Sequence, residues 1–238
     1  SGNIYVNGGT LALRSSTVGG GQQAGNGSAL SAGGGTIYLH SVGAALRLYS
    51  DYATSSTPVA NGRTDVVATY QNNIVIGQNV IAATVGVDRA TTSGATTRTI
   101  ALAGGLTFGG GAEPQTLTVE AANTYGLQIN GTTTLSGLPM INNPGSVTLA
   151  GLVTGDGVLS KMGAGILYLS NLSSLNDFSG GLNVYAGTVQ TYAKGTNSVQ
   201  NPQTQVPPIV GLVSDPFNNS VMSLTANSLG TGLVTLYG

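Results

Sequence analysis

Hydrophobic and polar residues alternate in short runs along most of the chain. The alternating hydrophobic pairs are Ile37/Leu39, Leu46/Leu48, Ile74/Ile76, Ile100/Leu102, Leu106/Phe108, Leu117/Val119, Leu127/Ile129 and Val147/Leu149. Successive side chains of a strand point to opposite faces, so a period of two predicts a strand with one buried face. We therefore expect each pair to face inward on a strand of about five residues. The sequence lacks the i, i+3, i+4, i+7 spacing over ten or more residues that would predict a helix.

Glycine groups separate the predicted strands, at Gly19–Gly21, Gly33–Gly35, Gly104–Gly105 and Gly109–Gly111. Glycine adopts positive φ angles at no steric cost and lets the backbone turn sharply. Short strands joined by glycine corners predict an all-β fold in which the chain winds into a β-solenoid with projecting loops. With about 20 residues in each three-sided turn, the chain would make on the order of a dozen turns, ~4.8 Å apart. We expect a single domain covering residues 1–238.

The most regular part of this pattern is the segment Gly151–Gln190. Its glycines and hydrophobic residues stand at fixed spacings, at Gly155, Gly157, Leu159, Lys161, Gly163, Gly165, Leu167, Leu169, Phe178, Gly180, Gly181, Val184, Gly187 and Val189. These positions resemble the autotransporter-associated β-strand repeat, whose pattern is GxGxLxKxGxGxLxLxG followed, after a spacer, by YxGGxxVxxGxL. Phe178 occupies the aromatic position, and Val189 stands where the family usually has leucine.

The resemblance implies a right-handed parallel β-helix that is secreted, generally as the exported passenger part of a bacterial surface protein. It therefore also implies an extracellular location, at the bacterial cell surface. The family has no common catalytic residues, so the resemblance assigns none to this chain.

Two parts of the sequence repeat each other. Ser1–Leu11 aligns without gaps with Ser179–Val189, and Leu30–Leu39 aligns more loosely with Ser228–Leu236. We therefore expect the chain to start partway through one repeat and to contain a second near its end, so that both ends are open in the middle of the pattern.

Composition narrows the function classes. Charged residues make up 6% of the chain, against ~25% in typical soluble domains, yet 40% of residues are hydrophobic, which argues against a disordered polar chain. The net charge of −1 excludes strong electrostatic attraction to nucleic acid. The absence of cysteine excludes disulfides and cysteine-ligated zinc. Because no hydrophobic run approaches the ~18 residues of a membrane helix, we expect no membrane insertion of this segment.

Three stretches do not fit the strand pattern, namely Ser50–Arg63, Val85–Arg98 and Thr191–Asn219. The last contains four prolines, which cannot donate to a strand ladder. We expect all three to project from one face of the solenoid, either as binding surfaces or as loops that are tolerated because they disturb nothing.

The chain has few residues that carry chemistry. His40 is the only histidine and is expected to point outward, because it follows the inward Leu39. His40, Asp51 and a serine do not match the spacing of a catalytic triad, and no G-x-S-x-G turn is present. One histidine without cysteines predicts no metal site, and Asp156, between two glycines, is interpreted as a turn residue.

The acidic residues are well separated in sequence, at Asp51, Asp65, Asp88, Glu113, Glu120, Asp156, Asp177 and Asp215. We interpret them, with Arg89 and Arg98, as surface charges and expect no catalytic, cofactor-binding or metal-binding residue. A solenoid can bring distant residues together, so a polysaccharide-active enzyme is a minor alternative.

Six tyrosines lie at or beside predicted strand positions, Tyr5, Tyr38, Tyr49, Tyr168, Tyr185 and Tyr237. Their rings are expected to stack between neighbouring turns, a contact that contributes about 0.5–1.5 kcal/mol per pair. The alternative is a stripe of rings that binds sugars or a partner.

Together these features predict a non-catalytic extracellular structural β-helix that forms or extends a bacterial surface fibre. Its partners would be copies of itself or adjacent repeats, stacked end to end. Leu233–Tyr237 would pair with the turn that contains Ile4–Leu13, in a heterologous contact that does not close and so builds filaments. The alternative is a passenger-type adhesin whose loops contact surface glycans or other cells.

Overall fold

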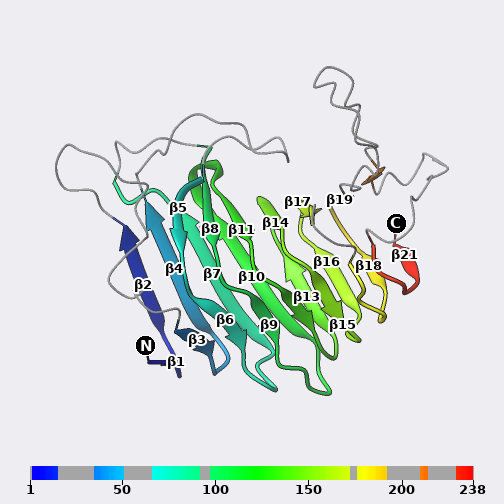
Figure 1. Ribbon diagram of the computed structural model, residues 1–238, viewed down its shortest axis with the longest axis horizontal. Helices are drawn as coiled ribbons and strands as arrows, with labels where there is room; N and C mark the ends of the chain where they lie inside the picture. The colour runs from blue at the N-terminus through cyan, green and yellow to red at the C-terminus, as the bar shows by residue number, and fades with distance from the viewer. Residues whose placement is uncertain are drawn as a thin grey trace.

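The computed structural model describes residues 2–15, 35–50, 66–91, 97–171, 176–191, 210–213 and 229–237. In these ranges the protein is all-β, with twenty-one strands and one short 3-10 helix, η1 (Ala122–Thr124). The strands form three sheets, which we name A, B and C. Within each sheet the strands lie side by side and follow one another along the long axis of the molecule (Figure 1).

The strands of each sheet come from the whole length of the chain. Sheet A contains, in spatial order, β1 (Ile4–Val6), β3 (Thr36–Leu39), β6 (Asn73–Ile76), β9 (Leu106–Phe108), β12 (Thr133–Leu135) and β15 (Val153–Gly155). Sheet B contains β2 (Thr10–Ser15), β4 (Ala44–Ser50), β7 (Ala82–Asp88), β10 (Gln115–Ala121), β13 (Pro139–Asn142), β16 (Leu159–Met162), β18 (Leu182–Val184) and β21 (Val234–Leu236). Sheet C contains β5 (Val66–Tyr70), β8 (Thr99–Leu102), β11 (Gly126–Ile129), β14 (Ser146–Leu149), β17 (Ile166–Leu169), β19 (Thr188–Thr191) and β20 (Val210–Val213).

The chain visits the sheets in rotation. From β6 to β17, successive strands lie in sheets A, B and C, and each strand from β6 to β14 pairs in parallel with the third strand after it. This cyclic order of parallel strands is compatible with the predicted β-helix. Among the strands described, only β19 and β20 pair antiparallel.

The core lies between the three sheets and is continuous from Val6 to Leu229. Both members of all eight alternating pairs are buried, which confirms their predicted inward direction. Full burial of each Leu, Ile or Val side chain contributes about 1.5–3 kcal/mol. Two tyrosines that the pattern did not single out also lie inside. Tyr70 donates a hydrogen bond to the carbonyl oxygen of Tyr49 (3.0 Å), and Tyr125 donates one to that of Ser50 (2.9 Å).

Glycine is required at two corners of the Gly151–Gln190 segment. Gly155 has φ +113°, and a Cβ there would lie 2.1 Å from the carbonyl oxygen of Leu135 in the neighbouring strand. Gly187 has φ +75°, and a Cβ there would lie 2.8 Å from Nζ of Lys161. These glycines thus allow left-handed backbone and close packing between strands, as their regular spacing predicts.

The two repeated segments form equivalent structures on different sheets. The first copy contributes β1 and β2 to sheets A and B, whereas the second contributes β18 and β19 to sheets B and C. Each copy nevertheless pairs with its loosely aligned follower in the same register, which gives Ile4↔Ile37 and Val6↔Leu39 in one copy and Leu182↔Val234 and Val184↔Leu236 in the other. Each copy of the repeat therefore pairs with the segment that follows it in the same register, but the two copies lie on different sheets.

The three predicted excursions are partly wrong. Val85 and Val87 lie inward on β7 and are buried, so the second excursion cannot begin at Val85. Residues 210–213 of the third excursion form β20, which hydrogen-bonds along β19 as an added antiparallel strand of sheet C. The alternating hydrophobic residues of β7 and the β-branched valines of β20 favour a strand, although turn-forming residues flank both segments. The rest of the predicted excursions, residues 51–63, 92–96, 192–209 and 214–219, lies outside the described ranges.

Candidate functional site

Within the part of the chain that the structure describes, no three His, Asp or Glu side chains gather closely enough to hold a metal ion. No helix of this part is long and apolar enough to span a membrane. His40 is exposed beyond β3, with its ring edge-on to Tyr5 at 6.1 Å. Asp51, Asp65 and Asp215 lie outside the described ranges. Glu113, Asp156 and Asp177 are exposed.

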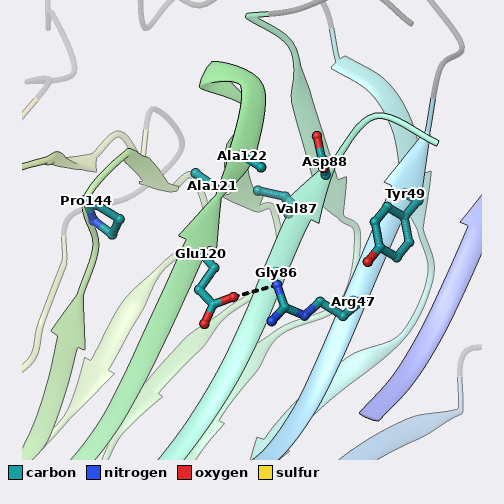
Figure 2. A pocket seen from close by; sticks show the side chains of 9 residues that line it. All are labelled: Arg47, Tyr49, Gly86, Val87, Asp88, Glu120, Ala121, Ala122 and Pro144. Carbon is teal, nitrogen blue, oxygen red and sulfur yellow. Dashed lines mark ion pairs between the residues drawn. The ribbon is translucent and has the colours of Figure 1, made fainter. Parts of the chain in front are cut away.

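The outer face of sheet B carries the one ion pair found among the described residues. Arg47 on β4, Gly86 on β7 and Glu120 on β10 are in register across three strands. Nη1 of Arg47 lies 2.5 Å from Oε2 of Glu120, and the two side chains are 34% and 46% exposed. A Cβ at position 86 would come within 2.5 Å of Cδ of Arg47. The glycine therefore lets the arginine side chain lie flat across β7 and reach the carboxylate (Figure 2).

This ion pair forms one side of an open pocket of about 250 Å³, which we name the Arg47–Glu120 pocket. The pocket is lined by Arg47, Tyr49, Gly86, Val87, Asp88, Glu120, Ala121, Ala122 and Pro144. In Figure 2, Tyr49 lies on one flank of the pocket and Pro144 on the opposite flank, with Ala121, Ala122 and Asp88 between them. The pocket thus combines a guanidinium, two carboxylates, one aromatic ring and a small apolar wall.

Tyr49 and Asp88 are in register with each other, and neighbouring groups hold both in place. The Arg14 guanidinium on β2 stacks over the Tyr49 ring at 4.6 Å, and its Nη1 donates to the carbonyl oxygen of Ala90 (2.9 Å). Asp88 Oδ1 accepts hydrogen bonds from the side-chain amide of Asn123 (2.6 Å) and from a backbone N–H (2.7 Å). The pocket is therefore preorganised on its β4 and β7 sides.

The sequence pattern did not predict this pocket. Asp88 and Glu120 were expected to be scattered surface charges, and they do lie at the surface, but the structure brings them into one pocket although they are 32 positions apart in the sequence. Arg47 was missed as a candidate. The signal was its position between the inward Leu46 and Leu48, because such a position predicts an outward side chain on a strand.

Lys161 is the opposite case, a charged side chain on the inner face of sheet B. It is fully buried and lies on β16. Its Nζ donates hydrogen bonds to the carbonyl oxygens of Met162 (2.6 Å), Gly163 (2.7 Å) and Ala186 (3.1 Å). Burial lowers the pKa of the Lys161 ammonium from 10.5 to about 8. This lysine fastens the corner after β16 to the corner after β18.

Two pairs of outward-facing tyrosines stack across neighbouring strands, as predicted, whereas Tyr49 packs against Arg14. The ring centroids of Tyr5 and Tyr38 are 4.8 Å apart, and those of Tyr185 and Tyr237 are 4.4 Å apart. Partial desolvation and a hydrogen bond with Tyr237 raise the pKa of Tyr185.

The last strand of sheet B presents hydrophobic side chains to solvent. We define the β21 edge as residues 233–237. Within the described ranges β21 is hydrogen-bonded on one side only, to β18. The exposed fraction is 81% for Leu233, 47% for Leu236 and 43% for Tyr237.

The comparisons with known proteins give no relative for this chain. No protein-family model matches it, and neither a curated protein nor a solved structure matches it. The resemblance to the autotransporter-associated repeat therefore stays a prediction.

Proposed function

We propose that this chain is a non-catalytic structural β-helix of right-handed coil, exported to the bacterial surface, which extends a fibre by stacking of copies end to end. Its partners are further copies of the same chain. The parallel pairing throughout sheets A and B and the cyclic strand order support this proposal, because a stack of parallel turns can be lengthened without a change of fold.

The observation that carries the proposal is the β21 edge. A strand paired on one side only offers a row of backbone N–H and C=O groups to another strand. Val234 and Leu236 lie on the same face as the buried Leu182 and Val184 and so continue the core of sheet B, yet Leu236 is half exposed. A further parallel strand would complete both the ladder and the core.

The strand at the other end of sheet B fits this edge. Leu11 and Leu13 of β2 face the core, with the same spacing as Val234 and Leu236. Placing β2 of one copy beside β21 of another sets Leu11 opposite Val234 and Leu13 opposite Leu236. The same register sets Arg14 opposite Tyr237. One face of the Arg14 guanidinium packs on Tyr49 of its own copy, and its other face can then stack on the Tyr237 ring of the neighbouring copy.

Cysteine cross-linking tests this register, because the natural chain contains no cysteine. Ala12 and Thr235 are adjacent to these pairs and point outward, so Ala12→Cys combined with Thr235→Cys should form disulfides between copies. Neighbouring strands are ~4.8 Å apart, within the ~4.4–6.8 Å that a disulfide spans. Within one copy the two positions lie at opposite ends of an eight-stranded sheet, roughly 34 Å apart, so no internal bond can form.

The expected result is a ladder of multimers on non-reducing gels, together with filaments in electron micrographs. Thr10→Cys combined with Thr235→Cys is the matched control, because this pair is displaced by two residues along the strand and should not cross-link. Single short rods at every concentration, without a ladder, would contradict the proposal. Filaments that form without this cross-link would support end-to-end stacking but contradict the proposed register between β2 and β21.

Two alternatives lead to other tests. A passenger-type adhesin would contact surface glycans or cells through its loops. A deletion of residues 203–217 that tests this would also remove β20 and so uncover β19. A polysaccharide-active enzyme would need a reactive pair of carboxylates. Asp88 and Glu120 share a pocket, but each is engaged by hydrogen-bond donors, which favours a role in binding.

A further inference from the structure

We infer that the Arg47–Glu120 pocket is a sugar-binding site, which takes one neutral hexose ring of a polysaccharide chain on the outer face of sheet B. This site is independent of end-to-end stacking, because its lining residues lie on β4, β7, β10 and η1 and just after β13, and none of them lies on the edge strands β2 and β21.

The size and openness of the pocket fit one ring of a longer chain. Its volume of about 250 Å³ is below the ~300–1,000 Å³ of pockets that enclose drug-sized ligands. The pocket is open to solvent on the outer face of sheet B, so a sugar ring bound in it can stay linked to neighbouring rings outside it. A terminal residue or an internal residue of a polysaccharide can therefore occupy it.

The polar groups match the hydroxyl groups of a sugar. Each hydroxyl both donates and accepts, so neighbouring hydroxyls can donate to a carboxylate and accept from a guanidinium at the same time. Arg47 and Glu120 present these two planar groups side by side, and both are about one-third to one-half exposed. Hydrogen bonds to charged groups are the stronger ones, and the ion pair holds both groups in a fixed geometry before binding.

The aromatic ring and the apolar wall match the C–H face of a hexose. Arg14 covers the Tyr49 ring from β2, which lies on the side of β4 away from the pocket. The other side of Tyr49 borders the pocket, opposite Ala121, Ala122 and Pro144. Aromatic rings bury much area at low cost in side-chain entropy, and this ring is already held in place.

Charge favours a neutral sugar over an acidic one. The lining contains one cation, Arg47, and two carboxylates, Asp88 and Glu120. A uronate or a phosphate would bring a further negative charge next to both carboxylates, and like charges repel in such a site. A hexose with hydroxyl groups alone avoids this cost.

The binding experiment uses the full chain and defined oligosaccharides, with titration calorimetry and saturation-transfer NMR. The probes are hexasaccharides of β-1,4-linked glucose, mannose and N-acetylglucosamine, of α-1,4-linked glucose, and of galacturonate as the acidic probe. We expect at least one neutral probe to bind, with saturation transfer to its ring protons, and the galacturonate probe to bind at least about tenfold more weakly. Failure of every neutral probe, or preference for galacturonate, would overturn the assignment.

Variants tie binding to the pocket. Arg47→Ala and Glu120→Gln should each weaken binding about tenfold or more, as expected for the loss of a hydrogen bond to a charged group. Tyr49→Ala should weaken it similarly, whereas Tyr49→Phe should not, because the ring rather than the hydroxyl contacts the sugar. Glu113→Gln is the matched control, since Glu113 is exposed and lies outside the pocket.

Two further outcomes would overturn the inference. Binding that is unchanged in both Arg47→Ala and Glu120→Gln, with circular dichroism confirming the fold, would place the sugar elsewhere. Release of reducing ends from a bound probe by the natural chain but not by Glu120→Gln would show that the pocket hydrolyses the polysaccharide and does not only bind it.

Discussion

Arg47 and Lys161 are two cations on sheet B whose side chains point in opposite directions, that of Arg47 toward solvent and that of Lys161 into the core. Arg47 lies between inward leucines on β4, so its side chain points outward and pairs with Glu120. Lys161 lies two residues after the buried Leu159 on β16, on the inward side of the alternation, so its side chain enters the core. There it meets three carbonyl oxygens. The position in the two-residue period decides whether a charge helps to form a surface site or fastens the interior.

The largest effect is expected when a charge is placed inward without such carbonyl partners. Leu167→Asp puts a carboxylate into the core next to Val147 and Val189, and should unfold the chain or lower its stability by several kcal/mol. Urea denaturation followed by circular dichroism measures the change. Asn183→Asp, at an outward position of β18, is the control and should change stability little. A stable and soluble Leu167→Asp variant would contradict the inward assignment.

Loss of the buried ammonium is expected to come next. Lys161→Met keeps most of the side-chain volume but removes the ammonium donor from three carbonyl oxygens, of which that of Met162 also accepts from the backbone N–H of Asn143 (3.1 Å). Because an unsatisfied buried acceptor costs ~1–3 kcal/mol, we expect a loss of about 3 kcal/mol or more in the free energy of unfolding. Arg47→Met, the matched change on the outer face, should cost at most about 1 kcal/mol, as is typical of exposed ion pairs. Equal losses in the two variants would remove the distinction between the two cations.

The same lysine should make stability depend on pH. Because burial lowers its pKa from 10.5 to about 8, the unfolded chain binds a proton between these pH values that the folded chain has released. The free energy of unfolding should therefore rise as the pH increases from 8 to 10.5. Thermal unfolding of the natural chain and of Lys161→Met across this window isolates the contribution of the lysine from that of the tyrosines. An identical pH profile for both would show that Lys161 keeps an ordinary pKa.

The smallest effect concerns Gly86, which gives Arg47 room to cross β7. Gly86→Ala should displace the arginine side chain and cost about 1 kcal/mol, whereas in an Arg47→Ala background the same change should cost nothing or stabilise the strand. A double-mutant cycle of unfolding free energies measures this coupling. Additive effects would mean that Gly86 does not hold the ion pair in its geometry.

Much of the local structure was predictable, because burial on one face of a strand imposes a two-residue period that the sequence displays directly. The eight alternating pairs are buried as expected, and the tyrosine stacks at Tyr5/Tyr38 and Tyr185/Tyr237 form as expected. The pattern also contained the answer for Lys161, since Leu159 and Lys161 share a face. The predicted start of the second excursion at Val85 was wrong. Turn-forming residues follow β7 directly, and they outweighed the alternation of Val85 and Val87 in the sequence pattern.

The sequence by itself determined which residues face inward and where the backbone turns, since both depend on near neighbours along the chain. Only the tertiary structure decided which turns lie beside each other and on which sheet each repeat falls. The length of chain between two paired strands can vary without any change in the local pattern. It differs, for example, between the pair β1 and β3 and the equivalent pair β18 and β21. For the same reason the pocket made from Arg47, Asp88 and Glu120 depends on the registers β4–β7 and β7–β10, which bring together residues as far as 73 positions apart.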